Sequence, residues 1–96
     1  MNKPLVTQAD VVVSQRGHDA GSVMLVVGMQ GDRFALVCDG KLRMAERPKL
    51  KNCAHIQKIG RSQQAEERLG SGHQLSNSEI RKMLLPFSIR LGRKEP

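Results

Sequence analysis

A dense run of basic side chains between residues 41 and 61 is the part of the sequence with the clearest chemistry. This segment holds seven Lys and Arg residues against Glu46 alone, a net charge of +6. Lys and Arg neutralise phosphates and release bound counterions, so such a segment is typical of proteins that bind nucleic acid. A solvated charged face is the alternative interpretation. The cations expected to contact RNA are Lys41, Arg43, Arg47, Lys49, Lys51 and Lys58.

Polar side chains in and near this segment could add hydrogen bonds to the same ligand. Asn52 and His55 carry groups that could contact phosphate, sugar or a base edge, but they could equally satisfy nearby backbone groups. Arg16 and His18 lie in a turn-rich loop with two glycines. We include all four in the predicted RNA-binding set.

The sequence has no recognisable catalytic or metal-binding pattern. Its His and Cys residues include no Cys-x-x-Cys and no His pair at helical spacing, and Cys53-Ala54-His55 alone cannot fill a tetrahedral zinc site. Neither a Walker-type loop nor a dinucleotide fingerprint is present. We therefore expect no enzyme activity, no metal and no cofactor.

Length and composition narrow the class of protein. The 96 residues, at 10.7 kDa, carry a net charge of +7 and have a sequence pI near 10.1. A chain this short has a modest core, so most of its chemistry must lie on the surface. Two cysteines are too few for a disulfide framework, and no signal peptide or membrane-length apolar run is evident. We expect a cytoplasmic protein with reduced thiols and no membrane partner.

Four or five short strands are predicted within the first sixty residues. Apolar and β-branched runs at 11–14, 22–29 and 33–38 favour strands, and a turn at 30–32 favours a hairpin between the last two. Asp39-Gly40 is a strong hairpin signal and predicts a reversal into a strand at 41–44, which Pro48 ends. Residues 53–59 could supply a final strand. Together these elements predict a mainly β fold, a small antiparallel barrel.

The composition changes after residue 60. We expect residues 1–60 to form the barrel, 61–75 a polar and mobile linker with a frayed helical turn at 64–69, and 76–96 a helix and basic tail. Ser76-Asn77-Ser78-Glu79 matches a capping box, and Pro86 is expected at the end of the helix that follows.

This C-terminal helix is predicted to be amphipathic. A helix of about ten residues is marginal by itself, so its apolar stripe must dock on the barrel or on a partner protein. The stripe recurs at i, i+3, i+4 and i+7 and consists of Ile80, Met83, Leu84 and Phe87.

Three spaced motifs resemble the KOW-domain RNA-binding proteins. They are the Val13-Ser14-Gln15-Arg16-Gly17-His18-Asp19-Ala20-Gly21 loop, the Asp39-Gly40-Lys41-Leu42-Arg43 turn and the Pro48-Lys49-Leu50-Lys51-Asn52-Cys53-Ala54-His55 segment. More narrowly, they are similar to short bacterial relatives of a KOW-bearing large-subunit ribosomal protein family of archaea and eukaryotes. The resemblance implies an SH3-like barrel that contacts ribosomal RNA through the first loop and neighbouring basic turns, without catalysis.

Two positions depart from the pattern that the resemblance implies. His18 stands where relatives commonly carry Arg, and Ala20 stands where a Lys is common. A weaker contact by this loop follows, so more of the binding is expected from the basic segment.

Two functions are consistent with these features. The first is a ribosome-associated protein that binds folded ribosomal RNA of the large subunit by shape and charge, since the chain has only two aromatic residues. The alternative is a protein-interaction module that binds RNA polymerase or another translation or transcription factor through the apolar stripe of the helix.

Overall fold

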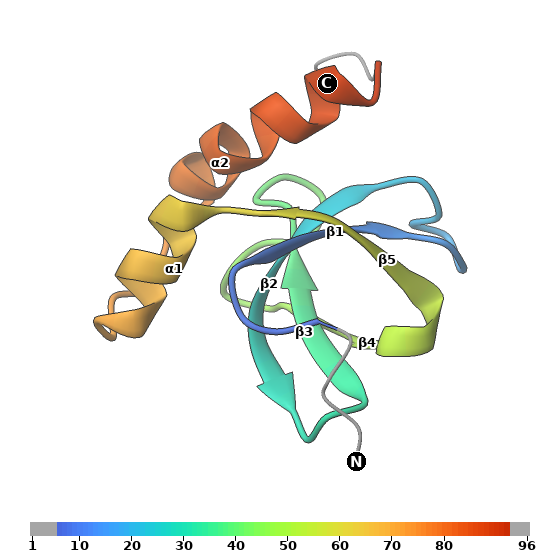
Figure 1. Cartoon of the computed structure of the whole chain (residues 1–96), viewed down its shortest axis with the longest axis horizontal. Helices are drawn as coiled ribbons and strands as arrows, with labels where there is room; N and C mark the ends of the chain where they lie inside the picture. Colours follow the sequence, from blue (N-terminus) through green and yellow to red (C-terminus); the bar gives the residue numbers. More distant parts are fainter. Residues whose placement is uncertain (1–5, 93–96) are drawn as a thin grey trace.

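Five antiparallel strands form one sheet in the computed structural model, which describes residues 6–92 (Figure 1). The first four strands follow one another across the sheet, and the fifth returns to pair with the first, giving the order β4-β3-β2-β1-β5. The mainly β, barrel-like fold with a C-terminal helix is therefore confirmed. The strands are β1 (Asp10–Ser14), β2 (Val23–Gln30), β3 (Phe34–Cys38), β4 (Lys49–Asn52) and β5 (Ile56–Arg61).

Two irregularities in strand pairing bend the sheet. The register of β1 against β5 shifts between Val11 and Val12, and that of β2 against β3 shifts between Val26 and Gly28. Extra residues of this kind bend a strand and increase its twist. The short sheet therefore curls toward a barrel.

Both faces of the central strands are buried. Val12, Met24 and Val26 belong to one apolar cluster, whereas Val11 and Leu25 belong to a second cluster that includes residues of the helices. Neighbouring residues of a strand point to opposite faces, so a strand covered on both sides must be apolar throughout. This accounts for the unbroken apolar runs of β1 and β2 in the sequence.

The segment from 61 to 75 is more ordered than the expected polar linker. It contains a helix, α1 (Gln63–Gly70), whose first turn is capped because the Ser62 side chain accepts a hydrogen bond from the backbone of Ala65. Ala65 and Leu75 are buried in the cluster shared with the sheet. The helical turn expected at 64–69 lies within α1, and the segment packs on the sheet through its few apolar side chains.

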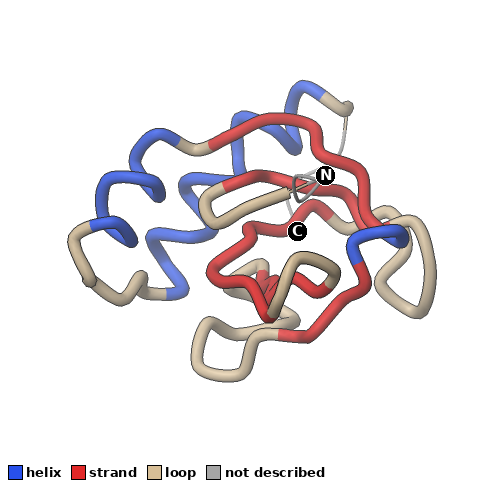
Figure 2. Tube along the Cα trace, turned by 60° about the horizontal axis from the view of Figure 1, so that its bottom comes forward, coloured by secondary structure: helices blue, strands red, loops and turns tan. Residues whose placement is uncertain are grey.

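The C-terminal helix, α2 (Asn77–Arg90), begins as predicted with a capping box between Ser76 and Glu79. Pro86 lies inside the helix, so the expectation that it ends the helix was wrong. Proline removes one backbone donor, but the ring of Phe87 packs against Gly60 of β5 and holds the last turns in place. Figure 2 shows α1 and α2 together beside the strands. Of the predicted basic tail, residues 93–96 lie outside the described part.

The prediction of a strand at 41–44 is wrong, because these residues form part of a loop. The Asp39 carboxylate accepts hydrogen bonds from the backbone amides of Lys41 and Arg43 at 2.9 and 2.8 Å. The amides of Asp39 and Gly40 both bond to the carbonyl of Arg43. These local bonds take the place of strand pairing, and β4 starts only after Pro48.

The final strand predicted at 53–59 is correct in its second half. Residues 53–55 form a short 3₁₀ helix, η1 (Cys53–His55), and β5 follows from Ile56. The Asn52 side chain accepts a hydrogen bond from the Ala54 amide at 2.9 Å, so it caps η1.

Candidate nucleic-acid interface

The loop between β1 and β2, residues 15–22, is organised around one carboxylate. Asp19 accepts a hydrogen bond from the hydroxyl of Ser14 at 2.7 Å, and the amide of Gly21 bonds to the carbonyl of Ser14, also at 2.7 Å. Arg16 and His18 are exposed. The β1–β2 loop is therefore a closed turn that presents two basic residues.

Lys49 and Lys51, both predicted to contact RNA, are paired with Asp19. Lys51 Nζ lies 2.7 Å from Asp19 Oδ1 and donates to the carbonyl of Arg16 at 2.6 Å, with only 7% of its side chain exposed. Lys49 Nζ lies 3.2 Å from Asp19 Oδ2 and is more exposed. The prediction that Lys51 is a surface phosphate contact does not fit this position, because its ammonium is buried and its hydrogen bonds hold the β1–β2 loop on β4.

The electrostatics of this cluster follow from the same contacts. Burial by itself would raise the pKa of Asp19, but hydrogen bonds from Lys51, Ser14 and Lys49 outweigh it and hold the pKa well below its usual range. The carboxylate is therefore ionised at neutral pH, and it balances the charge of one of the two lysines. The cluster stabilises the loop, and Lys49 remains the more exposed of its two ammonium groups.

A second acidic residue neutralises the end of the basic segment. Asp10 is buried at the start of β1, and its Oδ1 atom lies 2.7 Å from Arg61 Nη1 and 3.3 Å from Lys58 Nζ. Arg61 also pairs with Glu66 at 2.9 Å. Lys58, a predicted RNA contact, thus lies beside a carboxylate, although its side chain remains partly exposed. Arg61 belongs to the same charge cluster and was not in the predicted set.

The loop between β3 and β4, residues 39–48, carries the predicted cations that remain free. Lys41, Arg43 and Arg47 are exposed, and none forms an ion pair with a carboxylate within residues 6–92. The guanidinium of Arg43 makes one long hydrogen bond, 3.4 Å, to the carbonyl of Arg47. These three cations share the loop with the carboxylates of Asp39 and Glu46, and they are the predicted cations of the basic segment that lie in no ion pair of the described chain.

Helix α2 fixes the position of the β3–β4 loop. Arg81 Nη1 donates to the carbonyl of Gly40 at 2.6 Å, and the Asn77 side chain accepts from the amide of Ala45 at 2.7 Å. Asn77 also donates to Glu46, which lowers the pKa of that carboxyl. Arg81 was not predicted as a site residue. Its position on the polar side of the helix, opposite the apolar stripe, is the sequence signal that could have found it.

The side chain of Asn52 fits the structural alternative better than the ligand-binding one, whereas the recorded contact of His55 is made by its backbone. Asn52 uses its side-chain oxygen to cap η1, and the backbone carbonyl of His55 accepts from the amide of Gln15 at 2.8 Å. Both residues are half-buried. They help to join η1 to the β1–β2 loop.

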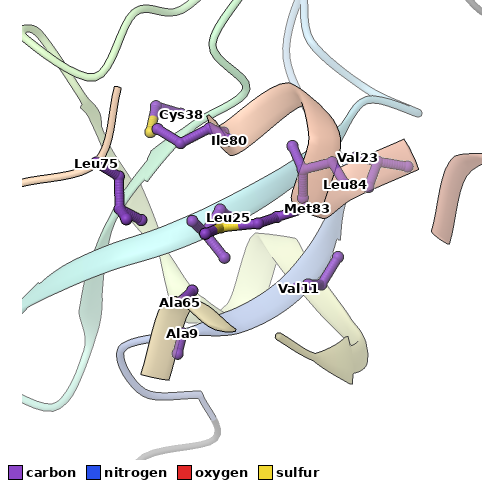
Figure 3. Close-up of a cluster of buried hydrophobic side chains, with 10 residues drawn as sticks. All are labelled: Ala9, Val11, Val23, Leu25, Cys38, Ala65, Leu75, Ile80, Met83 and Leu84. Atoms are coloured by element: carbon purple, nitrogen blue, oxygen red, sulfur yellow. The ribbon is translucent and has the colours of Figure 1, made fainter. Parts of the chain in front are cut away.

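The apolar stripe of α2 is packed on the chain's own sheet. Ile80, Met83 and Leu84 are 8% exposed or less and belong to one buried cluster with Val23 and Leu25 of β2 and Cys38 of β3 (Figure 3). Phe87, the last residue of the stripe, is half-buried beside Gly60. Two docking sites were considered for this helix, the barrel and a partner protein. In the structure the helix is docked on the barrel. A partner could reach Ile80, Met83 and Leu84 only if the helix left the sheet.

No group of three or more His, Cys, Asp or Glu side chains within residues 6–92 is arranged to hold a metal ion. The two cysteines are buried and free, and burial raises the pKa of the Cys38 thiol to about 12 and that of Cys53 above its usual value. Neither thiol is therefore activated as a nucleophile. Neither α-helix of the described part has the length and apolar character needed to cross a membrane.

No family model matches the chain, and no curated protein matches it.

Proposed function

We propose that this protein is a non-catalytic RNA-binding protein that contacts folded RNA through the β3–β4 loop. The observation that carries the proposal is the division of the basic residues into paired and unpaired sets. Asp19 pairs with Lys49 and Lys51, and Asp10 pairs with Lys58 and Arg61, whereas the three cations of the β3–β4 loop form no ion pair in the described chain. Cations left free on one rigid surface are suited to phosphates.

The β1–β2 loop, which carries the exposed Arg16 and His18, is the second part of the proposed RNA-binding surface. Residues 20–22 of that loop and residues 39, 41 and 42 of the β3–β4 loop border the same groove, so an RNA strand that meets one loop can reach the other. Two loops that contact successive phosphates would bind RNA by its shape and charge rather than by its sequence.

The aromatic content supports folded rather than single-stranded RNA. The chain has two Phe and no Trp or Tyr, and the ring of Phe87 packs against Gly60. Proteins that bind single strands generally stack successive bases on aromatic side chains, and that platform is lacking among these residues. Ribosomal RNA of the large subunit, in the cytoplasm, is the target that the resemblance to KOW-domain proteins favours.

Sedimentation of the tagged protein from a cell lysate tests this function. At about 0.1 M salt the protein is expected to comigrate with the large ribosomal subunit, and at about 0.5 M salt it is expected to be released, because contacts to phosphate weaken steeply with salt. A protein that stays at the top of both gradients would exclude stable association with the ribosome.

A further inference from the structure

An open groove lies between one face of α2 and the two loops described above. One wall consists of residues 20–23, a second of residues 39, 41 and 42, and the third of one face of α2. The helix residues that line it include Ser78, Arg81, Lys82, Leu85 and Ser88, which recur at spacings of three and four and therefore share a face. The face of α2 that is turned into the groove therefore lies next to the apolar stripe and overlaps it at Leu84, so it presents both polar and apolar side chains.

The charge of the groove favours an anion. Lys41, Arg81 and Lys82 line it, and Asp39 is the single carboxylate among the lining residues. The Asp39 carboxylate already accepts hydrogen bonds from the backbone amides of Lys41 and Arg43. None of the three cations forms an ion pair with another described residue. The cations therefore dominate the local potential.

The walls of the groove are held together before any ligand binds. The hydrogen bond of 2.6 Å from Arg81 to the carbonyl of Gly40 joins α2 to the β3–β4 loop. Gly40 also lies so close to the backbone of Asn77 that a Cβ atom there would meet the Asn77 carbonyl oxygen at 2.5 Å. A preformed site loses less conformational entropy on binding than a flexible one.

We propose that this groove holds one strand of the sugar–phosphate backbone of the RNA, with Lys41 and Lys82 contacting phosphates from opposite walls. The inference rests on the proposed function and extends the binding surface from the β3–β4 loop to α2. The hydroxyls of Ser78 and Ser88 add hydrogen-bond donors along the same path, and Leu42 and Leu85 present apolar surface to ribose and base faces. The binding surface is then continuous from Arg47, across the loop, to the face of α2 that lines the groove.

A pair of variants within α2 tests the groove. Lys82→Gln removes a charge from the groove, whereas Arg90→Gln removes the same charge from the same helix at a residue that does not line it. With purified large-subunit ribosomal RNA as the probe, Lys82→Gln is expected to lower the slope of log affinity against log salt by about 1. Arg90→Gln is expected to leave the slope at the wild-type value.

The outcomes separate this inference from the function on which it rests. Equal slopes for Lys82→Gln and Arg90→Gln, together with a lower slope for Arg43→Gln, would overturn the groove and leave the β3–β4 loop as the RNA site. That result would direct attention to an acidic protein segment as the occupant of the groove. Wild-type slopes for all three variants would overturn both proposals.

Cross-linking gives a second, independent measurement. Cys38 and Cys53 are buried, so a photoreactive maleimide can be attached selectively to an introduced cysteine in the native protein. Ser78→Cys places the probe in the groove, and Ser71→Cys, at the end of α1, serves as the matched control. RNA cross-links from position 78 but not from position 71 are expected. Equal yields at the two positions would contradict the proposal.

Discussion

Lys51 donates a hydrogen bond of 2.7 Å to Asp19 and thereby ties β4 to the β1–β2 loop. The two residues are 32 positions apart in the sequence, and the lysine is nearly buried. An ammonium held in this way stabilises the loop rather than attracting an outside anion, because its charge is compensated and removed from solvent. Lys51 therefore belongs to the basic residues that stabilise the fold, in contrast to those that are exposed to solvent and form no ion pair.

The first prediction concerns the difference between Lys51 and Lys49. Lys51→Met keeps the apolar stem but removes the ammonium from Asp19 and from the carbonyl of Arg16, so the free energy of unfolding should fall by roughly 1–3 kcal/mol. Lys49→Met removes a partly exposed ion pair and should cost about 1 kcal/mol or less. Urea denaturation measures both. Equal stabilities of the two variants would contradict the structural role of Lys51.

The second prediction concerns acid. Because the pKa of Asp19 in the folded protein lies below its value in the unfolded chain, about 3.9, its ion pairs stabilise the fold fully above that pH. Their contribution is lost as the pH falls from about 4 toward the folded pKa. Asp19→Asn should lower stability at pH 7 by roughly 3 kcal/mol and make the decline below pH 4 shallower. Denaturation at several pH values tests this, with Asp32→Asn, in an exposed turn, as the control.

The third prediction concerns the contact between the β3–β4 loop and α2. Gly40 and Gly31 both have positive φ, +75° and +67°, so alanine is strained at either site by about 1 kcal/mol. At Gly40 the added methyl group would also meet the backbone of Asn77, whereas at Gly31 it would enter open space. Gly40→Ala should therefore lower the melting temperature clearly more than Gly31→Ala. Equal shifts would mean that the loop does not lie against the helix.

Local patterns predicted the parts of the fold that local interactions determine. The β2–β3 hairpin and the capping box of Ser76 and Glu79 each depend on residues close together in the sequence, and both are present. Helix α1 was underestimated because it has few apolar side chains. Its signal was the N-cap Ser62, followed by Ala65 and Leu69 at helical spacing.

The assignment of site residues depended on contacts that local patterns cannot predict. Asp10 and Arg61 are 51 positions apart, and their ion pair requires β1 and β5 to be neighbours. The sequence therefore indicated a basic segment but could not distinguish its compensated residues from its free ones. The fold makes that distinction, because β5 pairs with β1 and brings Lys58 to Asp10, and the curled sheet brings Lys51 of β4 to Asp19 of the β1–β2 loop.

The most direct test of the RNA-binding surface is the salt dependence of affinity for the double variant Arg43→Gln with Arg47→Gln. Its control is Arg33→Gln with Arg90→Gln, which removes the same charge from the β2–β3 turn and the end of α2. With purified large-subunit ribosomal RNA, the first variant should lower the log–log slope by about 2 and weaken binding, while the control retains nearly the wild-type slope. Equal slopes for the two double variants would mean that net charge alone drives binding, and would contradict a site on the β3–β4 loop.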